Sequence, residues 1–347
     1  MKRLQYLFVF ILPFTVIISF NLSGIWTLLP AFVFFGLIPI IELLFKPNHN
    51  NFSPEIINTE KEARFYDWIL YLAVFVQIAM LIYFLDMISD PGLTNLEIIG
   101  NVLSMGMMCG VFGINIGHEL GHRKNRAEQF LAEISLLTSL DTHFLPYHNA
   151  GHHKNVATPN DSATAAKGEI LYLFWIKSHF GSYLEAWKIE NSRLRKQKKR
   201  IFSLNNRMIG YSIANVGILS ILYFVFGMFT LLCFISAAVI GILLLETINY
   251  IEHYGLLRQK YDNGKYENVT PVHSWNSDHI LGSLLLFNLS RHSDHHYIAS
   301  KKYQILNSIP ESPQMPTGYP GMVLFSLMQP LWFIYMNRHL ANYQNKN

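Results

Sequence analysis

Residues 96–123 read LEIIGNVLSMGMMCGVFGINIGHELGHR, and this stretch decides the fold. Its first part, 96–116, is apolar and long enough to cross a bilayer, whose hydrocarbon core needs about 20 helical residues. The stretch then runs directly into His118 and His122, which lie four residues apart and therefore face the same side of a helix. A membrane-spanning helix that ends in two potential metal ligands is the pattern from which the rest of the chain follows.

Further apolar runs of similar length accompany this one. They are 5–21, 24–45, 66–86, 208–226 and 228–248, with a minimal turn at Gly227 between the last two. Only 14% of the 347 residues are charged, against about 25% in ordinary soluble domains. The sequence therefore predicts one all-α integral membrane domain, residues 1–347, with six transmembrane helices. It excludes a disordered chain and, with only Cys109 and Cys233, a disulfide framework.

The positive charges predict the orientation of these spans. All 27 Lys and Arg residues precede the first span or lie in alternate loops, within 46–64, 123–207 and 258–346. Cytoplasmic loops carry such an excess. Both termini and the long polar segments 118–207 and 249–347 are therefore expected in the cytoplasm, as a histidine-rich helical cap. The first 20 residues also resemble a secretory signal peptide, but the charge alternation favours a retained span.

The densest charge run is RLRKQKKR at 193–200. We interpret it first as a solvated helix face beside anionic lipid headgroups. A dock for an acidic electron carrier is the second interpretation, and nucleic acid binding is not expected of a membrane protein.

Nine of the 15 histidines fall into four groups at ligand spacing. The groups are His118 and His122; His148, His152 and His153; His253; and His292, His295 and His296. In the second group, residues 148 and 152 are expected to share a helix face, with 153 about 100° round, so that neighbouring histidines address two adjacent metals. Neutral imidazole suits iron, copper or zinc, and nine donors are too many for one ion. A dinuclear iron site fits better than zinc, which needs four ligands, or three and a water.

Acidic residues adjoin these histidines. Glu119, Glu252 and Asp294 are expected to accept ring N–H groups and so fix each tautomer, with direct metal ligation as the open alternative. Among the other histidines, residues 143, 273 and 279 are candidates for supporting donors, and residues 49, 179 and 339 for plain surface groups. The segment 275–278 either contributes to a carrier dock or braces the fourth group.

These motifs together resemble those of the membrane-bound non-haem di-iron alkane 1-monooxygenases, relatives of xylene monooxygenase and, more distantly, of fatty acid desaturases. The matching strings are HELGHR at 118–123, HNAGHHKNVATP at 148–159, NYIEHYGLL at 249–257, HSWNS at 273–277, RHSDHH at 291–296 and PTGYPG at 316–321. The string around His253 is the most specific, because desaturases share the histidine spacing but not this string. Two positions depart from the family pattern: Tyr147 replaces the usual Glu, and Ser290 the usual Gln.

The resemblance implies that the nine histidines hold two irons and that dioxygen oxidises the terminal methyl of a medium-chain n-alkane or similar hydrophobe. It further implies a separate rubredoxin-type carrier with its NADH-dependent reductase, and a place in the bacterial inner membrane. We expect Phe34, on the second span, either to influence chain-length selection or to be an ordinary lipid-facing aromatic residue. The alternatives are a hydroxylase of a xylene-type methyl or fatty acyl group, a lipid desaturase, and a histidine-rich metal transporter. A transporter would hold its ligands near the membrane midplane, whereas these histidines lie just outside the spans.

Overall fold

The computed structural model describes residues 3–345, so Lys2 and Lys346 of the charge pattern lie outside the described residues. The described chain folds into helices, and its β pairing is limited to two isolated bridges, Lys260–Tyr266 and Asn276–Gln314. The predicted all-α fold is therefore confirmed.

The α-helices are α1 (Ile11–Phe20), α2 (Leu29–Phe32), α3 (Ile38–Leu44), α4 (Pro54–Glu62), α5 (Arg64–Ile88), α6 (Asn95–Met108), α7 (Ile116–Gly121), α8 (Arg126–Leu137), α9 (Phe144–Tyr147), α10 (His153–Asn155), α11 (Leu171–Lys196), α12 (Arg207–His253), α13 (Ile280–Leu285), α14 (His292–Tyr297), α15 (Tyr319–Leu327) and α16 (Gln329–Gln344). Short 3-10 segments are η1 (Leu4–Phe10), η2 (Gly24–Leu28), η6 (Pro271–His273) and η7 (Tyr303–Ile305), and π-helical segments are η3 (Val33–Leu37), η4 (Cys109–Asn115) and η5 (His148–His152).

Within residues 3–345, four helical stretches are long and apolar enough to cross a membrane. They are Gly24–Leu44, Arg64–Ile88, Asn95–Gly121 and Arg207–His253. Leu4–Phe20 is also apolar but shorter. Every apolar run predicted from the sequence thus lies on a helix, although the six runs correspond to four helices of spanning length, because the first run is short and the last two share α12.

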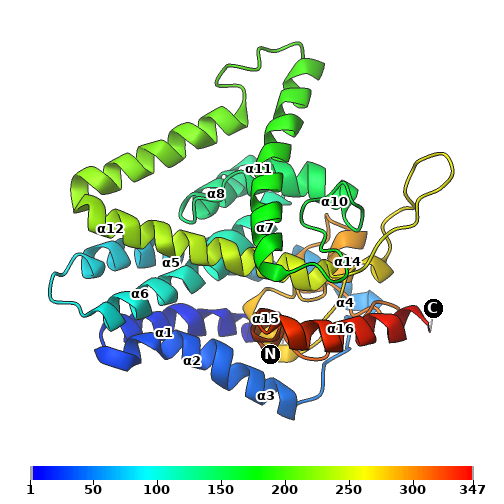
Figure 1. The fold of residues 1–347 in the computed structure, drawn as a ribbon, viewed down its shortest axis with the longest axis horizontal. Helices are drawn as coiled ribbons and strands as arrows, with labels where there is room; N and C mark the ends of the chain where they lie inside the picture. Colours follow the sequence, from blue (N-terminus) through cyan, green and yellow to red (C-terminus); the bar gives the residue numbers. More distant parts are fainter. Residues whose placement is uncertain (1–2, 346–347) are drawn as a thin grey trace.

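The helix α12 is interrupted at Gly227, where φ is 83° and ψ is 176°. Figure 1 shows that the two arms of α12 fold back on one another at the left end of the molecule. A Cβ placed on Gly227 would have no heavy atom within 4 Å, so crowding does not select glycine here. The backbone conformation selects glycine at this position, because this region of φ and ψ is reached essentially only by glycine.

Gly227→Ala is expected to lower the free energy of unfolding by about 1–3 kcal/mol, because alanine must adopt a strained conformation at the turn. The measurement is thermal unfolding in detergent. The matched control is Gly217→Ala, which also has open space around its Cβ but lies within a helical arm. There alanine should be neutral or stabilising by up to about 1 kcal/mol. Equal melting temperatures for the two variants would contradict the assignment.

Part of the first long polar segment, 118–207, returns alongside the helix that precedes it. Helix α8 packs against η4 and α7. Ser135 Oγ donates to the Phe112 carbonyl (2.9 Å), and Ser139 Oγ donates to the Cys109 carbonyl (3.0 Å). A Cβ on Gly113 would lie 2.0 Å from Ser139 Oγ, so glycine permits this approach. These hydroxyls provide hydrogen-bond donors to the backbone of the irregular, π-helical η4.

The turns between the long helices gather at one end of the molecule. The connections after Phe20 and Ile88 and the break at Gly227 lie on the left in Figure 1, whereas α7, α10 and α14, which carry histidines, lie further to the right. The connections at the left end carry no Lys or Arg.

Candidate metal centre

All nine predicted histidines meet in the structure, in two groups. One group comprises His118, His122, His148, His153 and His295, and the other comprises His152, His253, His292 and His296. Within each group, one ring nitrogen of every member lies within 4.8 Å of those of the others. Residues that are far apart in the sequence are thus brought together at the ends of α7 and α12 by η5, α10 and α14.

In the five-histidine group the Nε2 atoms face one another. Nε2 of His122 lies 3.1 Å from that of His118 and 3.2 Å from that of His148, and His118 Nε2 lies 3.1 Å from His295 Nε2. Burial lowers the pKa of His148 and of His295 well below the usual value, which keeps these rings neutral. A neutral imidazole has one donor and one acceptor nitrogen, so five such nitrogens cannot all be satisfied by one another. Their convergence is a donor set suited to a transition metal.

The four-histidine group has the same character. Nε2 of His292 lies 3.2 Å from Nε2 of His253. The ring of His152 is 5.0 Å from that of His253 and 4.8 Å from that of His296, measured between centroids. Nε2 of His152 and Nε2 of His296 are buried and have no hydrogen-bond partner among residues 3–345. Buried polar atoms without partners cost free energy, and a bound cation would remove that cost.

The two groups are neighbours because each His-His pair is divided between them. His153 belongs to the first group and His152 to the second, and likewise His295 and His296. The ring centroids of His153 and His296 are 4.6 Å apart. This arrangement fits two metal sites side by side.

The face sharing predicted for the second histidine group is wrong. His148 shares its group with His153, and not with His152 as an α-helix would require. The reason is the π-helical turn η5, in which the His153 amide donates to the His148 carbonyl. A π turn holds one additional residue, so positions i and i+5 come into line. Residue spacing alone does not reveal such a turn.

Asp161 orients His152 and was not singled out from the sequence. Its Oδ2 accepts from His152 Nδ1 (3.0 Å) and from Thr164 Oγ1 (2.6 Å), and its Oδ1 accepts from the Tyr147 hydroxyl (2.5 Å). Burial alone would raise the pKa of Asp161, but His152 and these hydrogen bonds lower it to about 2. Because Nδ1 of His152 donates to Asp161, Nε2 is left free to bind a metal. Tyr147, one of the two departures from the family pattern, therefore supports this carboxylate.

Of the three acidic residues predicted beside the histidines, Glu252 lies closest to a ring nitrogen. Its Oε2 is 3.1 Å from His292 Nε2, and its Oε1 accepts from the Tyr319 hydroxyl (2.6 Å). The same nitrogen, His292 Nε2, also faces His253 Nε2. The Glu252 carboxylate therefore lies on the side of the His292 ring that faces the other histidines of its group. Glu252 is thus placed at the centre itself, not behind a ligand.

Glu119 and Asp294 contact cations and backbone amides. Glu119 accepts from Arg123 (2.8 Å), and Asp294 accepts from Lys301 (2.5 Å) and the Asn307 amide (2.7 Å). These contacts tie α7 and α14 to neighbouring segments. The sequence predicted that both carboxylates would accept ring N–H groups of the histidines. In the structure they accept from cationic side chains and a backbone amide, which the sequence pattern did not indicate.

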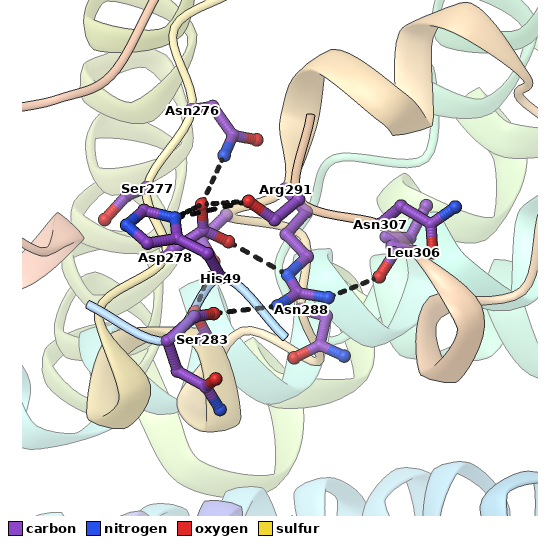
Figure 2. Close-up of polar contacts among 12 residues, drawn as sticks. His49, Asn276, Ser277, Asp278, Ser283, Asn288, Arg291, Leu306 and Asn307 are labelled. Carbon is purple, nitrogen blue, oxygen red and sulfur yellow. Dashed lines mark hydrogen bonds and ion pairs between the residues drawn. The ribbon is translucent and has the colours of Figure 1, made fainter. Parts of the chain in front are cut away.

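The segment 275–278 contacts α14 in the manner of a brace. Asp278 Oδ1 accepts from Arg291 Nε (3.1 Å), as Figure 2 shows, and Asn276 Oδ1 accepts from Ser293 Oγ (3.1 Å). Arg291 also donates to the Leu306 carbonyl (2.7 Å). Arg291 immediately precedes His292, so the position of the fourth histidine group depends on this network. A role in docking a carrier stays a prediction.

The other six histidines lie outside both groups. Their polar or ring contacts are His49 with Asp278, His143 with Asp141 and Ser182, His179 with His143, His273 with Glu267, His279 with Ser277, and His339 with Gln314. Asp141, His143 and His179 form a third cluster of potential ligands.

An apolar cavity ends at the histidines. His118, His148 and His292 line one part of it, and the remainder is lined mostly by apolar side chains, including Phe34, Met107, Leu244, Ile248, Leu285 and Val323. Met107 and His118 lie on one continuous helical stretch, so the cavity extends for about 15 Å along it. Its shape and lining suit an elongated hydrocarbon.

Comparisons with known proteins agree with this site. The fatty acid desaturase family matches residues 97–325. An alkane 1-monooxygenase of Ectopseudomonas oleovorans is 38% identical over 310 residues, covering 89% of this chain and 77% of the relative, and alkane 1-monooxygenase 1 of Alcanivorax borkumensis is 37% identical over 89% and 76%. The hydroxylase component of a Pseudomonas putida xylene/toluene monooxygenase is 26% identical over 96% of this chain and 87% of the relative. The chain therefore belongs to the fatty acid desaturase family and, within it, to the alkane 1-monooxygenases.

Proposed function

We propose that the chain hydroxylates the terminal methyl group of a medium-chain n-alkane with dioxygen. The observation that carries this proposal is the apolar cavity that ends at the nine histidines. Relatives that are 36–38% identical over about nine tenths of the chain are named alkane 1-monooxygenases.

The nine histidines would hold two iron ions, one in each group. Iron bound there would supply the redox chemistry that activates dioxygen. The rings offer neutral nitrogen donors, and Asp161 fixes the tautomer of His152. Glu252 accepts from the Tyr319 hydroxyl with Oε1, and its Oε2 lies beside His292 Nε2. Both Glu252 and His292 line the cavity.

The cavity would orient the alkane with one methyl at the histidines. Its mostly apolar lining favours a hydrocarbon chain, and a chain bound in extended form would present its end to the histidines in preference to inner carbons. A length of about 15 Å accommodates an extended chain of about a dozen carbons. This estimate places the substrate in the medium-chain range.

Phe34 is buried and lines the apolar part of the cavity, and we infer that it bounds the cavity away from the histidines. Phe34→Ala should lengthen the cavity and shift the preference for kcat/KM toward longer alkanes by about 10-fold, or about 1.4 kcal/mol. Competition between octane and hexadecane measures the shift. Phe32→Ala, which removes the same ring from an exposed position nearby, is the control. An unchanged ratio would contradict this role of Phe34.

We place the six apolar segments across a bacterial inner membrane, with both termini on the cytoplasmic side. The alternation of Lys and Arg and the common location of the turns that lack them support this topology. Reducing equivalents would come from NADH through a reductase and a separate rubredoxin-type carrier, because Cys109 and Cys233 cannot form a four-cysteine iron site.

The test is conversion of octane by the full chain in membranes with a rubredoxin and its reductase under oxygen-18 gas. The expected product is 1-octanol with one labelled oxygen. Unlabelled alcohol, or no alcohol with iron present, would overturn the proposal. An alkene product would identify a desaturase instead.

A further inference from the structure

A chain of buried ionisable groups lies beside the metal centre and takes no part in the site described above. Asp141 is 2% exposed and Glu246 is 3% exposed, while His179 is only partly buried. Burying an ionisable group in an apolar helical bundle costs free energy. Such groups in membrane proteins commonly mark proton pathways. Asp141, His143 and His179 offer ligand atoms within 4.8 Å of one another, a distance that one water molecule can bridge.

The hydrogen bonds of His143 show where a proton must lie. Ser182 Oγ donates to the His179 carbonyl (2.8 Å), so it can only accept from His143 Nε2, at 3.2 Å. The proton of a neutral His143 is therefore on Nε2, and Nδ1 presents a lone pair to Asp141 Oδ1, 3.2 Å away. This contact is favourable only when Asp141 or Nδ1 carries a further proton.

The acidities agree with a proton held by Asp141. Burial, with Glu246 nearby, raises the pKa of Asp141 well above its usual range. Burial, together with His179, lowers the pKa of His143 to about 3. The neutral acid next to the neutral ring is thus the stable form of the pair at neutral pH.

The inner end of the chain reaches the cavity. Glu246 accepts from Asn249 Nδ2 (3.2 Å), and Asn249 lines the cavity together with His118 and Glu252. The outer end is His179, whose ring centroid lies 5.1 Å from that of His143. The cluster of Asp141, His143 and His179 thus has a partly exposed member on α11, and Glu246, whose charge acts on Asp141, is hydrogen-bonded to a residue of the cavity wall.

We propose that His179, His143, Asp141 and Glu246 form the route by which protons reach the cavity. The inference rests on the proposed function. Hydroxylation breaks one C–H bond and the O–O bond, puts one oxygen into the alcohol and releases the other as water. It consumes two electrons, supplied by the carrier, and two protons. Because the cavity is lined mostly by apolar side chains, we assign the supply of those protons to this route.

A metal site is the competing explanation for this cluster, and the partners of His143 distinguish the two. Both nitrogens of His143 already face polar protein atoms of Ser182 and Asp141. Several nitrogens of the nine histidines instead face one another or have no partner among the described residues. The cluster thus has the hydrogen-bond pattern of a relay.

Asp141→Asn is the most direct test, because the new amide still donates to His143 Nδ1 but cannot release a proton. We expect turnover of octane to fall by about 10- to 100-fold, with unchanged iron content and KM. The solvent deuterium isotope effect on kcat should increase, and more hydrogen peroxide should be released per alcohol formed. Glu246→Gln should act in the same direction.

The control is Glu133→Gln, which alters a carboxyl group bonded to Tyr211 (2.7 Å) outside the route and should retain the wild-type isotope effect. If the wild-type protein forms labelled alcohol and Asp141→Asn and Glu246→Gln match it in rate and isotope effect, the relay is overturned and the hydroxylase function stands. A third metal ion per chain that is lost in Asp141→Asn would also overturn the relay. If the wild-type protein forms no alcohol, both proposals fail.

Discussion

His253→Ala is expected to remove about half of the bound iron and to lower alkane hydroxylation by about three orders of magnitude, or about 4 kcal/mol. His253 is fully buried, and its Nε2 lies 3.2 Å from His292 Nε2 within the four-histidine group. Removing it leaves three histidines for that ion, whereas the five-histidine group keeps all its donors. Iron analysis of purified protein and initial rates of octanol formation measure the two effects.

The control for His253 is His339→Ala. His339 contacts the Gln314 carbonyl (2.8 Å) and stacks on Trp275, outside both groups. Its replacement should leave iron near the wild-type amount. Thermal unfolding of both variants separates iron loss from loss of the fold. Wild-type iron content in a folded His253→Ala protein would remove this residue from the proposed ligand set.

Asp161→Asn is expected to weaken iron binding by about 10- to 100-fold, an effect typical of losing the carboxylate behind a metal-binding histidine. The hydrogen bonds explain why an isosteric amide is not tolerated. Oδ1 accepts from Tyr147 and the Ala163 amide, and Oδ2 accepts from His152 and Thr164. Since every partner is a donor, an amide NH₂ group would face a donor in either orientation. Release of iron to a chelator measures the change in affinity.

Tyr147→Phe provides a graded comparison for Asp161, because it removes one donor and leaves the carboxylate charged. Its effect on iron affinity should be smaller than that of Asp161→Asn. Asp262→Asn, in an exposed loop, is the matched control and should have no effect. If Asp161→Asn binds iron as tightly as the wild-type protein, the carboxylate does not support His152.

Hydropathy predicted the helices well because it follows directly from local composition. The break at Gly227 was also predictable, since a glycine separates two apolar runs. The return of α8 along η4 was not, because it depends on hydroxyls of Ser135 and Ser139 finding backbone carbonyls in a distant helix. Hydropathy shows only that the segment is more polar than a span.

The histidines that meet in the site were predictable from type and spacing, but their partners were not. The π turn η5 changed which rings share a side, and no spacing rule indicates where such a turn occurs. Asp161 lies nine residues from His152 and reaches it only through the turn between them. Glu119 and Asp294 turn toward Arg123 and Lys301, because a nearby cation competes with a ring N–H for a carboxylate.

The proposed ligand set of nine imidazoles would have a consequence for the direction of electron flow. Neutral ligands would leave the whole charge of the two proposed iron ions to be balanced by their surroundings, where Glu252 and Asp161 provide the nearest carboxylates of those described above. In a medium of low permittivity, this shortage of negative charge disfavours the more highly charged oxidised ions and raises their reduction potential. A centre built in this way accepts electrons readily from a mild donor, whereas bridging carboxylates would retain the oxidised state.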